Sequence, residues 1–128
     1  MLTQKFVLRA LLVAAVLAMV ATAAEAGGNA ANGATVFARC AICHNNTKGA
    51  GAKIGPDLFG VVGRKAGTEP GFSYSAAMKN AGFVWTNARL DAYIKAPQQV
   101  VLGNKMPFGG LPSAGQRADL IAYLDTLK

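Results

Sequence analysis

The apolar positions follow a helical repeat at both ends of the chain beyond residue 28. Between Asn29 and Cys40 they recur three or four residues apart and predict a short helix, in which Gly33 would let another backbone approach closely. Near the C-terminus, Ser113 and Gln116 form a capping box. It precedes apolar residues at helical spacing and predicts a C-terminal helix with an apolar face made of Leu120, Tyr123, Leu124 and Leu127.

The middle of the chain predicts two more helices. One should begin near Thr86 and end before Pro97, because the residue that precedes a proline is disfavoured in a helix. Its buried face would consist of Leu90, Tyr93 and Ile94. A shorter helix is expected over residues 75–81, closed by Gly82. Residues 83–85 are apolar but too few for more than a fragment of strand.

Long loops are expected between residues 45 and 71, where glycines are frequent and Pro56 and Pro70 interrupt the chain. Loops of this length are uncommon in a small domain unless they are functional or enclose something. No internal repeat or low-complexity block follows residue 26. We therefore expect one all-α domain, with three main helices, one short helix and long loops that wrap around a bound group.

Residues 1–26 have the pattern of an export signal. Two basic residues give this segment a positive start, residues 10–24 are apolar apart from Thr22, and Ala24-Glu25-Ala26 offers small residues for cleavage. Its removal would leave one domain over residues 27–128 in the periplasm. The alternative is a retained membrane anchor, but the apolar run is shorter than the ~20 residues that a spanning helix needs, and no flexible spacer follows it.

The domain that remains is basic. The formal net charge of +7 falls only to +6 when Lys5, Arg9 and Glu25 leave with the signal. Arg64-Lys65 is the one adjacent basic pair, so there is no Lys/Arg run of the kind that binds nucleic acid. The summed positive field favours acidic protein partners. We expect a monomer without stable membrane insertion. A domain this small buries only a modest fraction of its surface, so we expect a bound group to add to its hydrophobic core.

The two cysteines and the one histidine of the chain all lie in CAICH, from Cys40 to His44. A disulfide between Cys40 and Cys43 would close a very short loop, stabilise little and leave His44 unexplained. A thioredoxin-like redox pair is expected within a βαβ pattern, which this sequence lacks. Structural zinc usually takes four ligands, and these three residues lie too close together to enclose it. The fourth interpretation is covalent attachment of haem c, for which Cys-x-x-Cys-His is the expected motif.

Haem attachment explains the spacing of these three residues. Two cysteines three positions apart reach the two vinyl groups at one edge of a porphyrin, and the adjacent histidine is directed under the iron. The ligand on the opposite face of the iron then decides whether the protein is an electron carrier or has a site open to small molecules. After signal cleavage, only Met78 and Met106 can supply a thioether. Met78 lies in the expected short helix and fits core packing, whereas Met106 lies in a loop rich in glycine and proline, residues 103–110.

With these residues in view, the chain resembles the class I cytochromes c of the mitochondrial and short bacterial type, from Asn29 to Lys128. The resemblance implies one haem attached to Cys40 and Cys43, with His44 and Met106 as its axial ligands. The matching stretches are Gly33 to Phe37, CAICH, Gly55-Pro56-Asp57-Leu58, Gly63-Arg64-Lys65, Pro70-Gly71-Phe72-Ser73-Tyr74, Trp85, Leu90 with Tyr93, Lys105-Met106-Pro107-Phe108 and Leu120-Ile121-Ala122-Tyr123-Leu124.

The same resemblance implies how the surroundings of the haem are built. The carbonyl of Pro56 would accept a hydrogen bond from the ring N–H of His44 and fix its orientation. A haem propionate would be surrounded by three donors, Arg64, Tyr74 and Trp85. Tyr93 would lie near the sulfur of Met106, and Asn104 would lie near the loop that carries Met106. The first and last helices would cross at a contact between Gly33, Phe37, Leu120 and Tyr123. Met78 departs from the pattern, because many relatives carry an asparagine there.

Filling both axial positions with protein ligands favours electron transfer over catalysis. The resemblance therefore implies a carrier, not an enzyme, that exchanges electrons with an oxidase, a reductase, a dehydrogenase or a photosynthetic reaction centre. Acidic surfaces of these partners would meet lysines around the haem edge, namely Lys53, Lys79, Lys95 and Lys105. The competing hypothesis is a haem enzyme or gas sensor in which Met106 does not bind iron. A third is a colourless disulfide domain.

Overall fold

The computed structural model describes residues 27–128, so the expected signal at residues 1–26 lies outside it. The helices follow one another as α2 (Ala30–Phe37), α3 (Ala76–Lys79), α4 (Asn87–Lys95), α5 (Pro97–Val100) and α6 (Ala114–Asp125). The β pairing in this part of the chain is confined to an isolated bridge between Lys65 and Val84. The all-α class is therefore confirmed. None of the helices within residues 27–128 has both the length and the apolar character that a membrane span requires.

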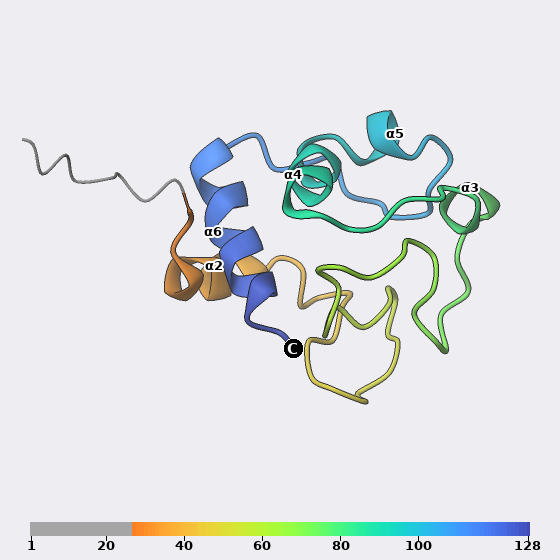
Figure 1. The fold of residues 1–128 in the computed structure, drawn as a ribbon, viewed down its shortest axis with the longest axis horizontal. Helices are drawn as coiled ribbons and strands as arrows, with labels where there is room; N and C mark the ends of the chain where they lie inside the picture. The colour runs from red at the N-terminus through yellow and green to blue at the C-terminus, as the bar shows by residue number, and fades with distance from the viewer. Residues whose placement is uncertain (1–26) are drawn as a thin grey trace, which may run out of the picture.

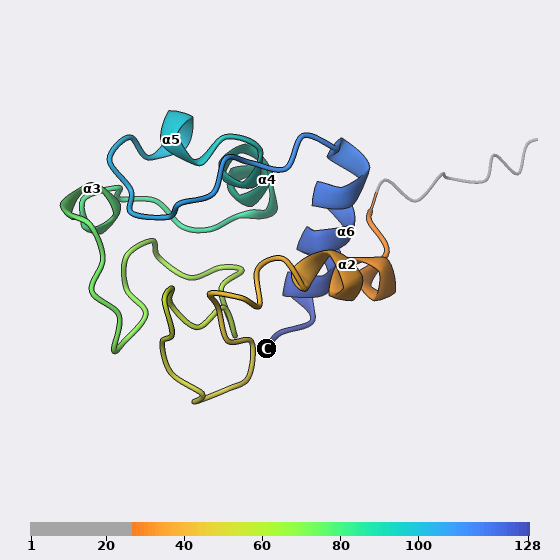
Figure 2. The ribbon, with the colours of Figure 1, turned by 180° about the vertical axis from the view of Figure 1, so that it is seen from behind.

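The helices surround a central region that the loops close. Helices α2 and α6 cross at one end of the molecule, and α3 lies at the other end (Figure 1). Between these ends, α4 and α5 run along one side, whereas the loops that follow α2 occupy the opposite side, as the view from behind also shows (Figure 2). The C-terminus returns to these loops, where the Gly60 N–H donates to the Leu127 carbonyl over 2.7 Å.

Each helix predicted from the sequence is present, and each begins at a polar cap. The cap side chain accepts a hydrogen bond from the backbone N–H three residues further on, at Asn29, Ser75, Thr86 and Ser113. Helix α2 ends before the predicted residue Cys40, because the chain continues in turns after Phe37. Helix α5 was not predicted. Pro97, which marks the end of α4, is also the first residue of α5, where its missing N–H costs no hydrogen bond.

The crossing of α2 and α6 depends on close approach at Gly33. A Cβ added there would lie 1.9 Å from the Asp119 carbonyl oxygen and 2.7 Å from Tyr123 Cβ. The rings of Phe37 and Tyr123 pack beside this contact with their centroids 5.2 Å apart. Leu120 is buried in the same core. The predicted contact between the two terminal helices is therefore confirmed.

Gly33→Ala is expected to lower the free energy of unfolding by about 2 kcal/mol. The new methyl group would overlap the α6 backbone and force the helices apart, and an overlap this close places the cost at the upper end of the ~1–3 kcal/mol typical of overpacking. That cost outweighs the ~1 kcal/mol that alanine gains over glycine within a helix. Urea denaturation of the haem-containing protein measures the difference.

Gly115→Ala in the first turn of α6 is the matched control. The nearest atom to its new methyl group is Ser113 Oγ at 3.9 Å, so this variant should be as stable as the wild type or more stable. A similar loss of stability in both variants would show that the crossing does not depend on the missing side chain of Gly33.

Candidate functional site

A cavity of about 430 Å³ lies between the loops after α2 and the side formed by α4 and the segment after α5. It is lined by every residue that the sequence singled out for the site: Cys40, Cys43, His44, Pro56, Arg64, Tyr74, Trp85, Tyr93, Asn104 and Met106. Much of the remaining wall is apolar, with Leu90 from α4 and Leu120 and Leu124 from α6. The fold thus brings together residues from both ends of the domain around one cavity.

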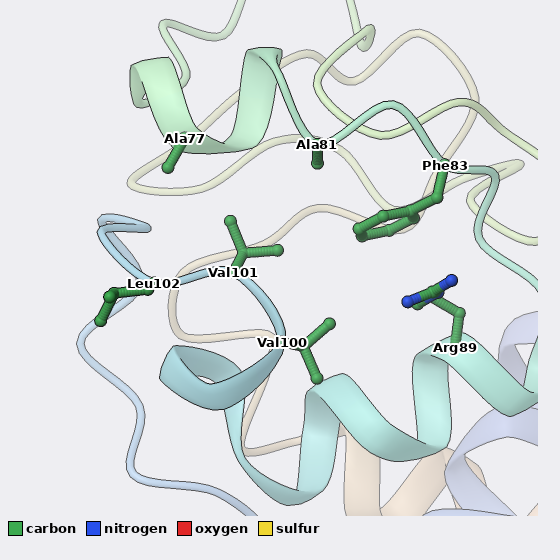
Figure 3. Close-up of a pocket in the computed structure, with 7 residues that line it drawn as sticks. All are labelled: Ala77, Ala81, Phe83, Arg89, Val100, Val101 and Leu102. Carbon is green, nitrogen blue, oxygen red and sulfur yellow. The ribbon is translucent and has the colours of Figure 1, made fainter.

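A second depression, of about 400 Å³, lies between α3, α4 and the end of α5 (Figure 3). Its walls are Ala77, Ala81, Phe83, Arg89, Val100, Val101 and Leu102. The Arg89 guanidinium lies 4.5 Å from the centroid of the Phe83 ring, which it partly covers. These walls include no cysteine, histidine or methionine, so they offer no attachment point or axial ligand for haem c.

The CAICH segment curls at the cavity wall directly after α2. The backbone N–H groups of Cys43 and His44 both donate to the Cys40 carbonyl, over 3.0 and 2.9 Å. No disulfide joins Cys40 and Cys43 in this structure, so the disulfide interpretation gains no support. Burial raises the pKa of the Cys40 thiol. Within residues 27–128, no three His, Cys, Asp or Glu side chains converge on a shared metal position, so the zinc interpretation lacks a ligand set.

The His44 ring is fixed by the loop that follows CAICH. Its Nδ1 lies 2.7 Å from the Pro56 carbonyl oxygen, which can only accept, so Nδ1 carries the proton and Nε2 keeps a free lone pair. Burial lowers the pKa of His44 more than the Pro56 hydrogen bond raises it, which favours the neutral imidazole that binds metals. A Cβ on Gly55 would lie 2.4 Å from His44 Cε1, so glycine makes room for the ring.

Met106 lies in a loop that side-chain amides hold in place. Asn104 Oδ1 accepts from the Met106 N–H over 2.9 Å, and Asn104 Nδ2 donates to the Val101 carbonyl over 2.9 Å. Gln98 in α5 clamps the start of the loop, because it accepts from the Gly103 N–H and donates to the Asn104 carbonyl, both over 3.0 Å. The sequence pointed to Asn104 but missed Gln98, since α5 itself was not predicted.

Met78 also borders the cavity. It lies in α3, where Ser75 Oγ caps its backbone N–H at 3.1 Å, and its side chain is buried in the core. Its interpretation as a core residue is therefore right, but the same side chain forms part of the cavity wall. Two thioethers thus border this space, one from a helix and one from a loop.

The polar and aromatic residues expected around a haem propionate lie together on the cavity wall. Arg64 Nη1 pairs with the Glu69 carboxylate at 2.6 Å, and the Glu69 N–H donates to the Tyr74 hydroxyl over 3.2 Å. The Trp85 ring packs against Tyr93, with centroids 4.9 Å apart. Burial raises the pKa of the Tyr93 hydroxyl to about 12, so it stays protonated at neutral pH. Glu69 contacts Arg64 and Tyr74 without lining the cavity, and the sequence did not indicate it.

The chemistry of these residues fits haem c. Two free thiols and a neutral imidazole with an available lone pair lie beside a space with largely apolar walls, and thioethers border the same space. Because Gly55 has no Cβ, the imidazole of His44 has room at this wall. The fold and the site together define a small monohaem cytochrome of the c type.

Comparison with known proteins agrees with this class. The sequence profile described as Cytochrome c matches residues 30–128. Cytochrome c2 of Rhodopila globiformis is 52% identical over 89 residues, which cover 70% of this chain and 83% of that protein. Cytochrome c2 of Rhodomicrobium vannielii is 48% identical over 103 residues, covering 80% of this chain and 82% of that protein. The solved structure of cytochrome cH from Methylobacterium extorquens matches with a TM-score of 0.73 and 41% identity, covering 77% of this chain and 99% of that one.

The chain therefore belongs to the cytochrome c family. It is an electron-transfer protein and not an enzyme, and it carries one covalently attached haem c, for which Cys40 and Cys43 fit the attachment motif.

Proposed function

We propose that this protein is a periplasmic one-electron carrier in which His44 and Met106 are the axial ligands of the haem iron. Bound haem c supplies an iron that exchanges single electrons between its ferric and ferrous states. The observation that carries the proposal is that both side chains line one cavity with the attachment cysteines and are held there by separate contacts, His44 by Pro56 and Met106 by Asn104. The signal-like pattern of residues 1–26 supports export.

The chain's own residues favour reversible transfer at a high potential. The Pro56 carbonyl orients the His44 ring and raises its basicity. The hydrogen bonds around Asn104 and Gln98 hold the Met106 loop, so a change of charge at the site needs little rearrangement. Apolar walls keep water out and disfavour the extra positive charge of the oxidised site. We expect a positive reduction potential.

The absorption spectrum of the purified protein tests the ligand pair. We expect a methionine–iron charge-transfer band in the far red of the ferric protein, and no carbon monoxide binding by the reduced protein at neutral pH. A five-coordinate, high-spin spectrum would contradict the proposal and support the competing haem enzyme or gas sensor. The N-terminal sequence of protein from a periplasmic extract tests the location: it should begin at Gly27, and an N-terminus at Met1 would contradict cleavage.

We propose acidic docking faces on respiratory or photosynthetic redox proteins as the partners. Within residues 27–128, Glu69 and Asp91 are paired with Arg64 and Arg117. The other carboxylates of this range accept internal hydrogen bonds, from Phe59 to Asp57, from Asn29 to Asp119 and from Asn87 to Asp125. The remaining lysines and arginines of these residues take part in no ion pair. Their positive field therefore reaches solvent without local neutralisation.

Electron transfer to this protein from an acidic redox protein should slow as salt is added. The probe is reduced flavodoxin, an acidic one-electron flavoprotein, mixed with the ferric cytochrome in a stopped-flow instrument. Between about 0.01 M and 1 M ionic strength the Debye length falls from about 30 to about 3 Å. The second-order rate constant should fall by about tenfold or more, because steering is screened. A rate constant that does not depend on salt would contradict electrostatic docking.

A further inference from the structure

We propose that the depression between α3, α4 and the end of α5 binds a free aliphatic carboxylate. The head group of this ligand would pair with Arg89, and its alkyl chain would lie along the side chains of Val100, Val101 and Leu102. This is a binding function separate from the haem site, and it does not depend on which residues ligate the iron.

The depression has the size and the lining of a site for a small amphipathic molecule. Its volume of about 400 Å³ falls within the ~300–1,000 Å³ that is typical of ligand sites. The side chains of Val100 and Val101 point toward the side of α3 (Figure 3). Leu102 and Ala77 lie at one end of the depression, and Arg89 lies at the other. A ligand here would meet apolar walls along its length and a single charge at its end.

Arg89 is a cation without a counter-ion among the residues that the structure describes. Of the four arginines within residues 27–128, Arg64 and Arg117 are ion-paired, whereas Arg39 and Arg89 are not. No carboxylate lines the depression. A guanidinium group can hold a carboxylate through two parallel hydrogen bonds. Charge complementarity therefore favours a ligand with a carboxylate head group.

The position of Arg89 in α4 strengthens the preference for an anion. Arg89 lies in the first turn of this helix, which contains no acidic residue. The N-terminus of a helix carries a partial positive charge, so an anion stabilises the first turn and a cation does not. A carboxylate bound to Arg89 would therefore be attracted by the guanidinium and by the end of the helix together.

The Phe83 ring orders the cation and favours an alkyl chain over an aromatic ligand. The Arg89 guanidinium lies 4.5 Å from the centroid of this ring, and Trp85 packs against the ring in a T-shaped arrangement with centroids 4.8 Å apart. Because the guanidinium is held before a ligand arrives, its immobilisation costs little entropy on binding. The guanidinium already covers the ring, and the remaining walls are aliphatic side chains.

The experiment titrates octanoate into the reduced, haem-loaded protein and follows the methyl groups by NMR. The methyl signals of Ala81, Val101 and Leu102 should shift together and saturate, with a Kd of about 1 mM for a ligand of this size. Acetate has the charge without the chain, and 1-octanol has the chain without the charge. Each should bind at least about tenfold more weakly than octanoate, because each loses one of the two contacts.

Three variants test the assigned contacts. Arg89→Gln should weaken octanoate binding by about tenfold or more, since a charge-assisted hydrogen bond is lost. Arg39→Gln is the matched control: it removes the other unpaired arginine, which does not line the depression, and should bind octanoate as the wild type does. Leu102→Ser should weaken binding severalfold, and the fold should tolerate this change because Leu102 is 83% exposed. All three variants should keep the visible spectrum and the urea midpoint of the wild type, so that a loss of binding is not a loss of folding.

The inference is overturned if octanoate at about ten times the expected Kd leaves the three methyl signals unchanged. It is also overturned if Arg89→Gln and Arg39→Gln weaken binding equally, because the protein would then respond only to its net charge. Binding to vesicles of anionic phospholipid without binding of octanoate would overturn it as well, since the protein would then recognise a membrane surface. The proposed function fails on a different observation, a wild type that lacks the methionine–iron band.

Discussion

Replacing both Cys40 and Cys43 with serine is expected to give a colourless chain without stable helices. The cavity of about 430 Å³ would then lose the covalent group around which its walls pack. At ~24 cal/mol per Å³ of cavity, an empty space of that size costs up to about 10 kcal/mol. That is as large as the whole stability of a typical domain, about 5–15 kcal/mol. Circular dichroism and visible absorption of the purified chain measure both effects.

Ala41→Ser is the matched control for the double cysteine variant. It introduces the same hydroxymethyl side chain into the same segment but keeps both thiols, so the protein should keep its colour and its helical signal. The proposed role of the haem as part of the core fails if the double cysteine variant, purified without haem, shows the helical content of the wild type.

Met106→Ala is expected to have the next largest effect, on the iron site itself. Loss of the thioether should abolish the far-red charge-transfer band and allow the reduced protein to bind carbon monoxide. The reduction potential should fall by a few tenths of a volt, within the ~0.8 V range over which axial ligands tune haem. A potentiometric titration followed by absorption measures the shift.

Met78→Leu is the control for this experiment, because Met78 is the other thioether on the cavity wall. Leucine keeps nearly the same volume, so the core should tolerate it at a cost below about 1.5 kcal/mol. The variant should keep the far-red band. A band that survives in Met106→Ala and disappears in Met78→Leu would instead assign the sixth position to Met78.

Features that depend on neighbouring residues could be predicted from the sequence. The cap at Ser113 involves a backbone group three residues away and was located from the sequence, and the starts of the other predicted helices were placed at or near the residues that cap them, Asn29, Ser75 and Thr86. Helix α5 was missed for the opposite reason. A helix of four residues is too short to show a periodic pattern, and Pro97 indicates the end of one helix as well as the start of another.

The cavity itself could be predicted only in part. CAICH fixed three residues, and resemblance to a family supplied the others. The contacts that make the site work lie between loops and depend on the path of the chain, as with Gly55 against the His44 ring and Glu69 against Arg64.

The contact between α2 and α6 joins residues that are far apart in the sequence, since Asn29 and Asp119, which share a hydrogen bond, are separated by 90 positions. The Gly60 N–H and the Leu127 carbonyl are likewise distant partners. Contacts of this kind form only after a long stretch of chain has been brought together. Until the two helices meet, Cys40 and Cys43 stay accessible, so the topology favours attachment of the haem before folding is complete.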